Sequence, residues 1–244
     1  MSAGAAPLHP AMRVEVWSDV VCPWCYVGTR RFEQAVERFR DDGGGDVELV
    51  HRAFELDPHV PPEGTDLAEH LARKLGGRER VAAAHRRLAH IGAEVGIEFR
   101  WEGKRRVNTF DAHRLGAWAL EVAGPEVQAA LHQALFRAYF TDGADVADHG
   151  VLAGLAAEVG LDRDRAAEAL ATGAGADAVR ADEQRAREAG IHAVPTFVVE
   201  GRWTIPGAQD VETFLAVLRR ARERLVAAPA PEDDDGCADG ACTA

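Results

Sequence analysis

Two cysteines, Cys22 and Cys25, stand where an expected strand meets an expected helix. Residues 13–17, with the sequence RVEVW, alternate apolar and polar side chains as a half-buried strand does. Residues 27–40 repeat apolar side chains at helical spacing. Because proline suits the first position of a helix, Pro23 places Cys22 at the helix N-terminus and Cys25 one turn inside it.

The start of this helix bears on the chemistry of the first thiol. Unpaired backbone N–H groups and the positive end of the helix dipole stabilise an anion, so the thiolate form of Cys22 is favoured. We therefore predict that Cys22 is the attacking sulfur and Cys25 the resolving one. A Cys-x-x-Cys pair also supplies half of a structural zinc site, or can arise from two unrelated buried thiols. The flanking strand and helix favour the redox interpretation, which requires accessible sulfurs that lie close together.

A second informative stretch lies far along the chain. Pro195 directly precedes a β-branched run, residues 196–199. Residues 200–202, with the sequence EGR, form an expected tight turn, and residues 203–205 continue as a strand. The pattern predicts a hairpin with a proline at its entrance, which an ordinary trans proline could also provide.

Together these stretches resemble the thioredoxin superfamily and, within it, the DsbA family of disulfide oxidoreductases and its FrnE-like branch. The resemblance covers nearly the whole chain in the expected order. It implies an α/β protein with a thioredoxin-like fold and an inserted all-helical domain. The motifs that carry it are at residues 22–26 (CPWCY), 54–58 (FELDP), 108–114 (NTFDAHR), 194–196 (VPT) and 207–209 (GAQ).

The resemblance also implies roles for individual residues. Cys22 and Cys25 would be catalytic, and the Val194-Pro195 bond would be cis and face Cys22. Substrate binding would fall to residues that flank the thiols, namely Pro23, Trp24, Val194 and Pro195.

The motif at residues 108–114 has a simpler interpretation. Asn108 can cap a helix that begins at Thr109. The resemblance adds that Asn108 is a weaker candidate for shaping the substrate site. His113, in the same motif, is expected to be a satisfied structural histidine. No histidine is assigned to a metal, and no cofactor is expected.

The formal net charge of −12 argues against nucleic acid and anionic membranes as partners. Nucleic acid and anionic membrane surfaces would both be repelled.

Residues 1–13 carry no signal-peptide pattern, and no apolar run approaches the roughly 18 residues of a membrane span. We therefore expect a cytoplasmic protein. In a reducing compartment a dithiol is more often catalytic than structural.

Changes of composition divide the chain into segments. Proline and glycine end the first βαβ pattern near residue 58, and helical spacings then recur until about residue 189. The predicted parts are a flexible N-terminus (1–12), a thioredoxin-like domain (13–57 and 190–226), an inserted helical domain (58–189) and an acidic disordered tail with Cys-x4-Cys (227–244).

The tail cysteines, Cys237 and Cys242, have three interpretations. They could be idle thiols, they could hold zinc together with Cys22 and Cys25, or they could form a second redox pair. FrnE-like proteins are similar in having such a pair, which supports the third. Neighbouring carboxylates disfavour the thiolate forms, so we expect electrons to pass from the tail pair to the core pair. Ten flexible residues after Ala227 would span about 17 Å on average and about 35 Å when extended.

The predicted function is thiol–disulfide oxidoreduction on protein thiols, with chaperone activity as a further expectation. Expected partners are protein or small-molecule thiols and disulfides, including glutathione, and the chain is expected to be a monomer or a dimer. One alternative is a glutathione-dependent isomerase or kappa-type glutathione transferase, although these use serine where this chain has Cys22. Another is a chaperone or binding module without redox turnover.

Overall fold

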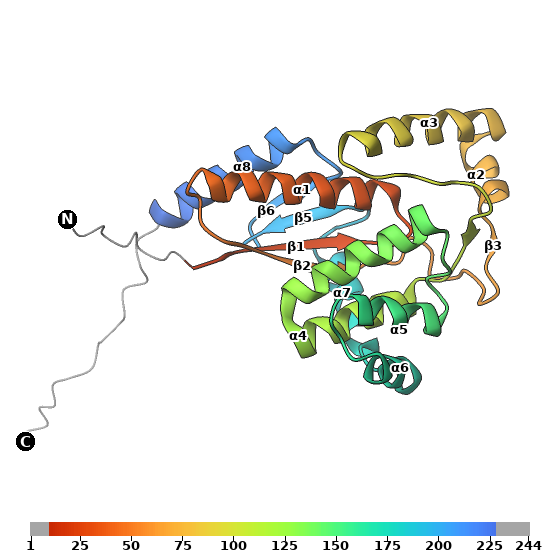
Figure 1. Cartoon of the computed structure of the whole chain (residues 1–244). Coiled ribbons are helices and arrows are strands. Elements are labelled where there is room, and N and C mark those ends of the chain that lie inside the picture. The colour runs from red at the N-terminus through yellow and green to blue at the C-terminus, as the bar shows by residue number, and fades with distance from the viewer. Residues whose placement is uncertain (1–9, 228–244) are drawn as a thin grey trace, which may run out of the picture.

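A computed structural model describes residues 10–227 of the chain. At its centre lies a four-stranded mixed sheet in the order β2-β1-β5-β6 (Figure 1). The strands are β1 (Met12–Ser18), β2 (Val47–Ala53), β5 (Thr196–Val199) and β6 (Trp203–Pro206). β1 pairs in parallel with β2 and antiparallel with β5, and β6 closes the predicted hairpin with β5.

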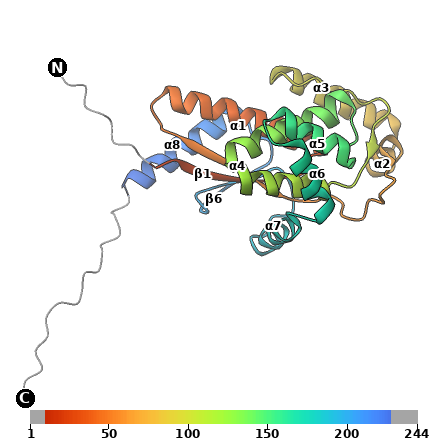
Figure 2. The ribbon, with the colours of Figure 1, turned by 60° about the horizontal axis from the view of Figure 1, so that its bottom comes forward.

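Helices α1 (Pro23–Asp41) and α8 (Val211–Ala227) cover one face of the sheet (Figure 1). Alternation along β1 turns Val14 and Val16 toward these helices, where they join a fully buried aromatic group, Phe32, Phe197 and Phe214. Helix α7 (Ala176–Glu188) lies on the opposite side (Figure 2). There the indole of Trp17 donates a hydrogen bond to the carbonyl of Asp182, 3.1 Å away.

The segment between β2 and β5 is mainly helical. It holds α2 (Leu67–Leu75), α3 (Arg78–Glu94), α4 (Phe110–Arg137), a π-helical turn (Ala138–Asp142), α5 (His149–Glu158), α6 (Arg163–Thr172) and α7. It is not all helical as expected, because β3 (Thr65–Asp66) pairs antiparallel with β4 (Arg105–Arg106). Among the described residues, no helix has the length and apolar character needed to cross a membrane.

The core of this segment is continuous with the helix that carries the cysteines. Cys25, Tyr26 and Val27 of α1 belong to the same buried cluster as residues of α3, α4, α5 and α6. The Tyr26 ring stacks on Phe136 with their centroids 5.1 Å apart. The segment Phe110–Arg137 consists of two helices that meet at Gly124, directly before Pro125, where φ is 84° and ψ is −179°.

Helix α8 runs alongside α1 in the same direction. Arg31 Nη1 donates to the carbonyl of Ala208, before α8, and Arg219 pairs with Asp42, just after α1. The end of α8 at Ala227 therefore lies beyond the far end of α1, away from the cysteines (Figure 1). The predicted tail pair, Cys237 and Cys242, lies outside the described residues.

Candidate active site

The turn between β1 and α1 places the two cysteines as the sequence predicts. Helix α1 begins at Pro23, and Cys22 is its N-cap with φ −91° and ψ 112°. The Cys22 N–H donates to the carbonyl of Asp19 at 3.0 Å, and the Cys25 N–H donates to the carbonyl of Cys22 at 3.0 Å. These bonds hold the first thiol at the start of the helix and the second one turn inside it.

The two cysteines differ in exposure. Cys22 is 5% exposed and Cys25 is 0% exposed. Both cysteines are therefore buried, and the expectation that the two sulfurs are accessible is wrong. The reason is packing, since three half-buried side chains, Val21, Trp24 and Val194, lie against the core cluster that contains both cysteines. Of the two residues, Cys22 alone keeps any exposed surface.

Burial also separates the ionisation of the two thiols. Removal from water raises the pKa of Cys25 well above its ordinary value, and the adjacent Cys22 raises it further through a side-chain hydrogen bond and its charge. A hydrogen bond from the Asp19 backbone acts in the opposite direction. Cys25 is thus held as a thiol next to the sulfur of Cys22.

The proline predicted to face the cysteines does so. The Val194-Pro195 bond is cis, and the Cys22 thiol lies 3.8 Å from the carbonyl oxygen of Val194. Gly28, which the sequence analysis did not single out, makes this approach possible. A Cβ at this position would lie 2.9 Å from Pro195 Cγ. The sequence does carry a signal for this role, because Gly28 is a small residue one helical turn after Cys25 and lies on the same side of the helix.

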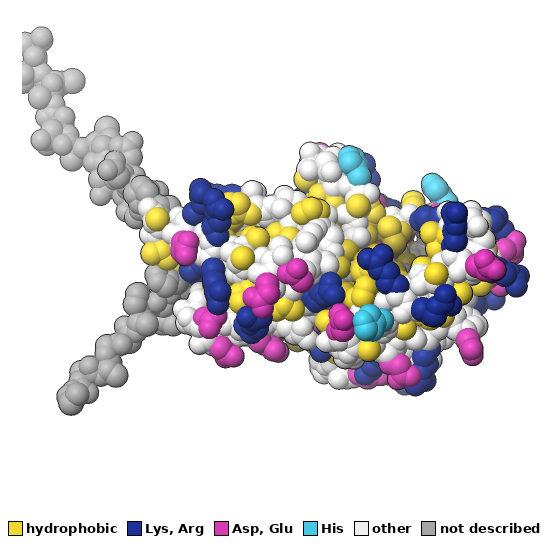
Figure 3. Space-filling view, turned by 90° about the horizontal axis from the view of Figure 1, so that it is seen from above, with side chains coloured by type: hydrophobic (Ala, Val, Ile, Leu, Met, Phe, Trp, Pro, Cys, Tyr) yellow, Lys and Arg dark blue, Asp and Glu magenta, His cyan; other side chains and the backbone are white. Residues whose placement is uncertain are grey.

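The intervening pair, Pro23 and Trp24, is half-buried beside the thiols. The guanidinium of Arg87, on α3, lies 6.0 Å from the centre of the Trp24 ring. The face of the molecule that carries α1 and α3 shows hydrophobic side chains around a hollow, with Lys and Arg side chains at its margin (Figure 3).

Asn108 lies at the start of α4 rather than against the thiols. Its Oδ1 accepts from the Phe110 N–H at 2.9 Å, and its Nδ2 lies 3.5 Å from the carbonyl of Pro58. The helix begins one residue later than expected, with Thr109 as N-cap. Asn108 is thus the residue before the N-cap, where its side chain accepts from the first N–H of the helix and lies against the loop after β2.

His113 departs from the expectation of a satisfied structural histidine. Its Nε2 lies 3.4 Å from Asp19 Oδ1, but the two atoms are not aligned for a hydrogen bond, and Nε2 has no other partner. Asp19 Oδ2 accepts from the N–H of Leu56 at 2.7 Å. The sequence analysis missed this pair, although an acidic residue three positions before Cys22 was a signal.

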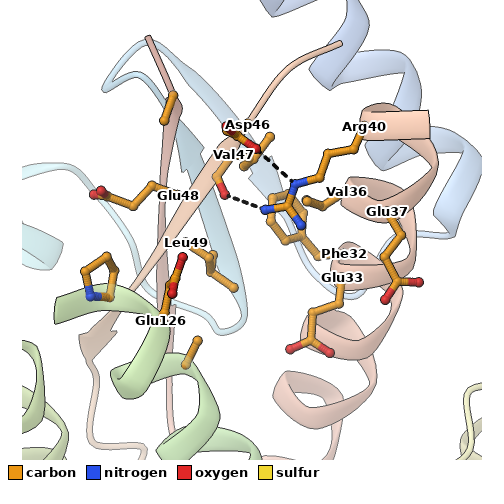
Figure 4. A pocket seen from close by; sticks show the side chains of 13 residues that line it. Phe32, Glu33, Val36, Glu37, Arg40, Asp46, Val47, Glu48, Leu49 and Glu126 are labelled. Atoms are coloured by element: carbon orange, nitrogen blue, oxygen red, sulfur yellow. Dashed lines mark hydrogen bonds and ion pairs between the residues drawn. The ribbon is translucent and has the colours of Figure 1, made fainter. Parts of the chain in front are cut away.

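A separate hollow of about 490 Å³ lies between α1, β2 and α4 (Figure 4). Its lining combines seven apolar residues with five acidic ones and Arg40, which pairs with Asp46 and donates to the carbonyl of Val47. No cysteine lines it, and it faces the part of α1 remote from Cys22. Within residues 10–227 no cluster of His, Cys, Asp or Glu side chains is arranged to hold a metal ion.

A mixed sheet, a Cys-Pro-Trp-Cys turn at a helix N-terminus and a cis-proline hairpin facing the first thiol together define a thioredoxin-fold protein with a dithiol site. More specifically, residues 13–219 match the family model described as the DSBA-like thioredoxin domain, and the chain belongs to that family.

Individual relatives support this assignment. A structure described as a probable DsbA oxidoreductase from Streptomyces coelicolor is 38% identical, with 86% of this chain and 89% of that chain covered and a TM-score of 0.78. The uncharacterized protein YwbO of Bacillus subtilis is 29% identical over 210 residues, which cover 83% of this chain and 94% of YwbO. The cytosolic disulfide reductase DsbM of Pseudomonas aeruginosa is 20% identical, with 87% and 99% coverage and a TM-score of 0.59, and it shows the shared fold alone.

Proposed function

We propose that this protein is a thiol–disulfide oxidoreductase that acts on protein thiols through Cys22 and Cys25. The observation that carries the proposal is the contrast between the two sulfurs. Cys22 keeps 5% exposure at the start of α1, whereas Cys25 is fully covered and adjacent to it. This arrangement suits one thiol for meeting substrate and the other for resolving the mixed disulfide.

The exchange proceeds in two displacements. In the oxidising direction, a substrate thiolate attacks the Cys22 sulfur of the Cys22–Cys25 disulfide, and Cys25 leaves as a thiolate that takes up a proton. A second substrate thiolate then attacks the substrate sulfur of the mixed disulfide. Cys22 leaves with the electron pair, so the substrate is oxidised to a disulfide and the protein dithiol is reduced. The polypeptide near Val194 lies beside Cys22 and is suited to pair with an extended substrate chain.

Insulin reduction tests this proposal. With dithiothreitol as the electron source, the wild-type protein should accelerate precipitation of the insulin B chain, and Cys22→Ser should abolish the acceleration. Full retention of activity in Cys22→Ser would contradict the proposal. Glutathione-dependent isomerisation retained in that variant would favour the isomerase or transferase alternative, and retained suppression of aggregation would favour a chaperone.

Glutathione is the small thiol that we propose as a partner. The P. aeruginosa disulfide reductase, a fold relative, has also been solved with glutathione. In this chain Arg87 lies over Trp24, so a cation is available beside the thiol site for an anionic tripeptide. Glutathione disulfide should oxidise the Cys22–Cys25 pair, and Arg87→Ala should slow that step while leaving oxidation by an uncharged disulfide unchanged.

For the tail cysteines we propose exchange between two molecules. Helix α1 has 19 residues and is therefore about 28 Å long, and α8 ends beyond its far end. Ten residues from Ala227 to Cys237 reach about 35 Å at full extension, so exchange within one chain would need an almost straight path. A mixture of Cys22→Ser/Cys25→Ser and Cys237→Ser/Cys242→Ser chains should exchange electrons at a rate that rises with concentration. No exchange in that mixture would contradict the proposal.

A further inference from the structure

A groove of about 420 Å³ lies between β6 and the C-terminal half of α8. Its apolar lining includes Trp203 and Val217, which pack against the buried cluster between the sheet, α1 and α8. Three exposed arginines, Arg202, Arg220 and Arg224, also line it, and no acidic residue of the described chain does. The groove is therefore positively charged, on a protein whose formal net charge is −12.

The arginines of α8 differ in what they contact. Arg220 and Arg224 are four residues apart and lie on the same face of the helix. Arg219, on a neighbouring face, pairs with Asp42. Within residues 10–227, by contrast, no carboxylate forms an ion pair with Arg220, Arg224 or Arg202. Three guanidinium groups thus line one groove and are available to an anionic partner.

The groove also follows an open edge of the sheet. β6 is the outermost strand on this side and pairs with β5 alone. At the opposite edge, side chains of the helical segment bond to β2. Gln128 accepts from the N–H of His51 and donates to its carbonyl, and Asp182 accepts from the N–H of Ala53. No described side chain bonds in this way to the backbone of residues 203–205, so β6 is accessible to a further segment.

The segment that follows α8 carries the complementary charge. The helix ends at Ala227, three residues after Arg224. Residues 228–244 contain five acidic residues and no lysine or arginine, and four of the five are consecutive, at residues 232–235 (EDDD). Guanidinium groups form strong, often bidentate pairs with carboxylates. The acidic run and the arginines of the groove therefore match chemically.

The acidic run is close enough in the chain to reach the groove. A helix rises about 1.5 Å per residue, so Arg220 lies about 10 Å before Ala227 along α8. The five residues from Ala227 to Glu232 span up to about 17 Å when extended. The chain can therefore turn back over the last turns of α8. A second copy could not set its own groove against this one, because the two sets of arginines would repel each other.

We propose that the groove between β6 and α8 is the docking site of residues 232–235, the acidic run of this chain's own C-terminal segment. The carboxylates of the run pair with the guanidinium groups of Arg202, Arg220 and Arg224. Cys237 follows the run by two residues and is brought close to Trp203.

The docked position lies at the end of the hairpin remote from the active site. Trp203 pairs with Val199, whereas the other end of the hairpin begins at Thr196, next to Pro195. Docking therefore holds Cys237 away from the thiols of its own chain. This agrees with the proposed exchange between two molecules, although the docking does not depend on it.

A bimane dye on Cys237 tests the docking, because tryptophan quenches bimane only at contact range. The full-length chain carries Cys22→Ser, Cys25→Ser and Cys242→Ser, so one thiol is left for labelling and the result is independent of redox activity. We expect emission to rise by about twofold or more in Trp203→Phe, and to a similar extent when NaCl is raised from about 0.05 M to about 1 M, because salt screens exposed ion pairs. Unchanged emission in Trp203→Phe would overturn the proposal.

Charge variants identify the groove as the partner. The triple variant Arg202→Gln/Arg220→Gln/Arg224→Gln should raise emission as Trp203→Phe does. Its matched control, Arg86→Gln/Arg163→Gln/Arg165→Gln, removes three exposed arginines on α3 and α6 and should leave emission unchanged. Equal emission from the two triple variants would show that the arginines of the groove do not hold the segment.

A charge exchange carries the test if circular dichroism shows that the first triple variant is misfolded. Replacement of residues 232–235 by lysine should raise emission. Adding Arg202→Glu, Arg220→Glu and Arg224→Glu to that chain should lower it again, and no recovery in a folded chain would overturn the pairing.

Dilution distinguishes docking within one chain from docking between chains. Quenching within one chain should stay constant over about a hundredfold dilution, because the segment is tethered to its own groove. Quenching that is lost on dilution would assign the groove to the segment of another copy and would contradict the proposal.

Discussion

The Cys22 sulfur lies 3.8 Å from the carbonyl oxygen of Val194, although 172 residues separate the two positions. The thiol site is therefore assembled from the first and last parts of the thioredoxin-like fold. The helical segment between them also contacts the site, because His113 Nε2, on α4, lies 3.4 Å from Asp19 Oδ1. The contribution of each part to activity or stability can be measured by substitution.

Cys25→Ser should trap a mixed disulfide on Cys22, because a hydroxyl cannot displace the substrate sulfur. After incubation with glutathione disulfide, mass spectrometry under non-reducing conditions should find one glutathione per chain when Cys237 and Cys242 are also replaced by serine. The double variant Cys22→Ser/Cys25→Ser in the same background should gain none. A comparable adduct rate on Cys25 in the single variant Cys22→Ser would contradict the assignment of Cys22 as the attacking thiol.

Gly116→Ala should destabilise the fold by about 1–3 kcal/mol, although alanine is the better helix former. A Cβ at this position would lie 2.6 Å from Cε1 of His132, whose buried ring is stacked on His51 and has little room to move. Gly154→Ala, in α5, is the matched control, since no atom lies within 4 Å of its added Cβ. It should stabilise by about 0.5–1 kcal/mol in urea unfolding. Equal urea midpoints for Gly116→Ala and Gly154→Ala would rule out a clash with His132 as the cause of the destabilisation.

Arg114→Ala should lower the free energy of unfolding by about 2–4 kcal/mol. The buried guanidinium of Arg114 donates at 3.0 Å to three carbonyl oxygens near the end of α6, those of Ala169, Leu170 and Ala174. Truncation leaves these acceptors without their donor, and Arg114→Lys should recover only part of the loss because an ammonium lacks the planar fork. Arg86→Ala, at an exposed position on α3, should change stability by less than about 0.5 kcal/mol. A urea midpoint for Arg114→Ala near that of Arg86→Ala would show that these bonds contribute little.

Glu55→Gln should become more stable relative to the wild type as pH rises from about 5 to about 8. Burial, and then the hydrogen bond with Glu183, raises the pKa of Glu55 from 4.5 to about 7. A raised carboxyl pKa means that the folded state holds a proton that the unfolded state has lost. Its contribution to stability is therefore present below about pH 4.5 and disappears as pH rises through about 7.

The glutamine variant cannot lose this proton, so the difference in urea midpoint between it and the wild type should grow over that pH range. Glu121→Gln, at an exposed position on α4, should show a constant difference. A constant difference for Glu55→Gln as well would mean that Glu55 titrates normally in the folded protein.

Several features of the fold could be predicted because they depend on near neighbours in the chain. The structure confirms three predictions that rest on such local properties. They are the alternating strand at residues 13–17, the helix that begins at Pro23, and the turn at residues 200–202. The break at Gly124 is also a local property, because glycine accepts the positive φ of 84° and Pro125 follows at the start of the second half.

The sequence by itself determined that two thiols stand at the start of a helix and that a proline opens a hairpin far away. Only the tertiary structure decided how deeply each sulfur is covered, that Gly28 admits Pro195, and that His113 meets Asp19. Burial and such contacts depend on which distant segments pack together. Asp19 and His113 are 94 positions apart, so no pattern of neighbouring residues could indicate their contact. The raised pKa of Cys25 follows from its burial in the same packed core.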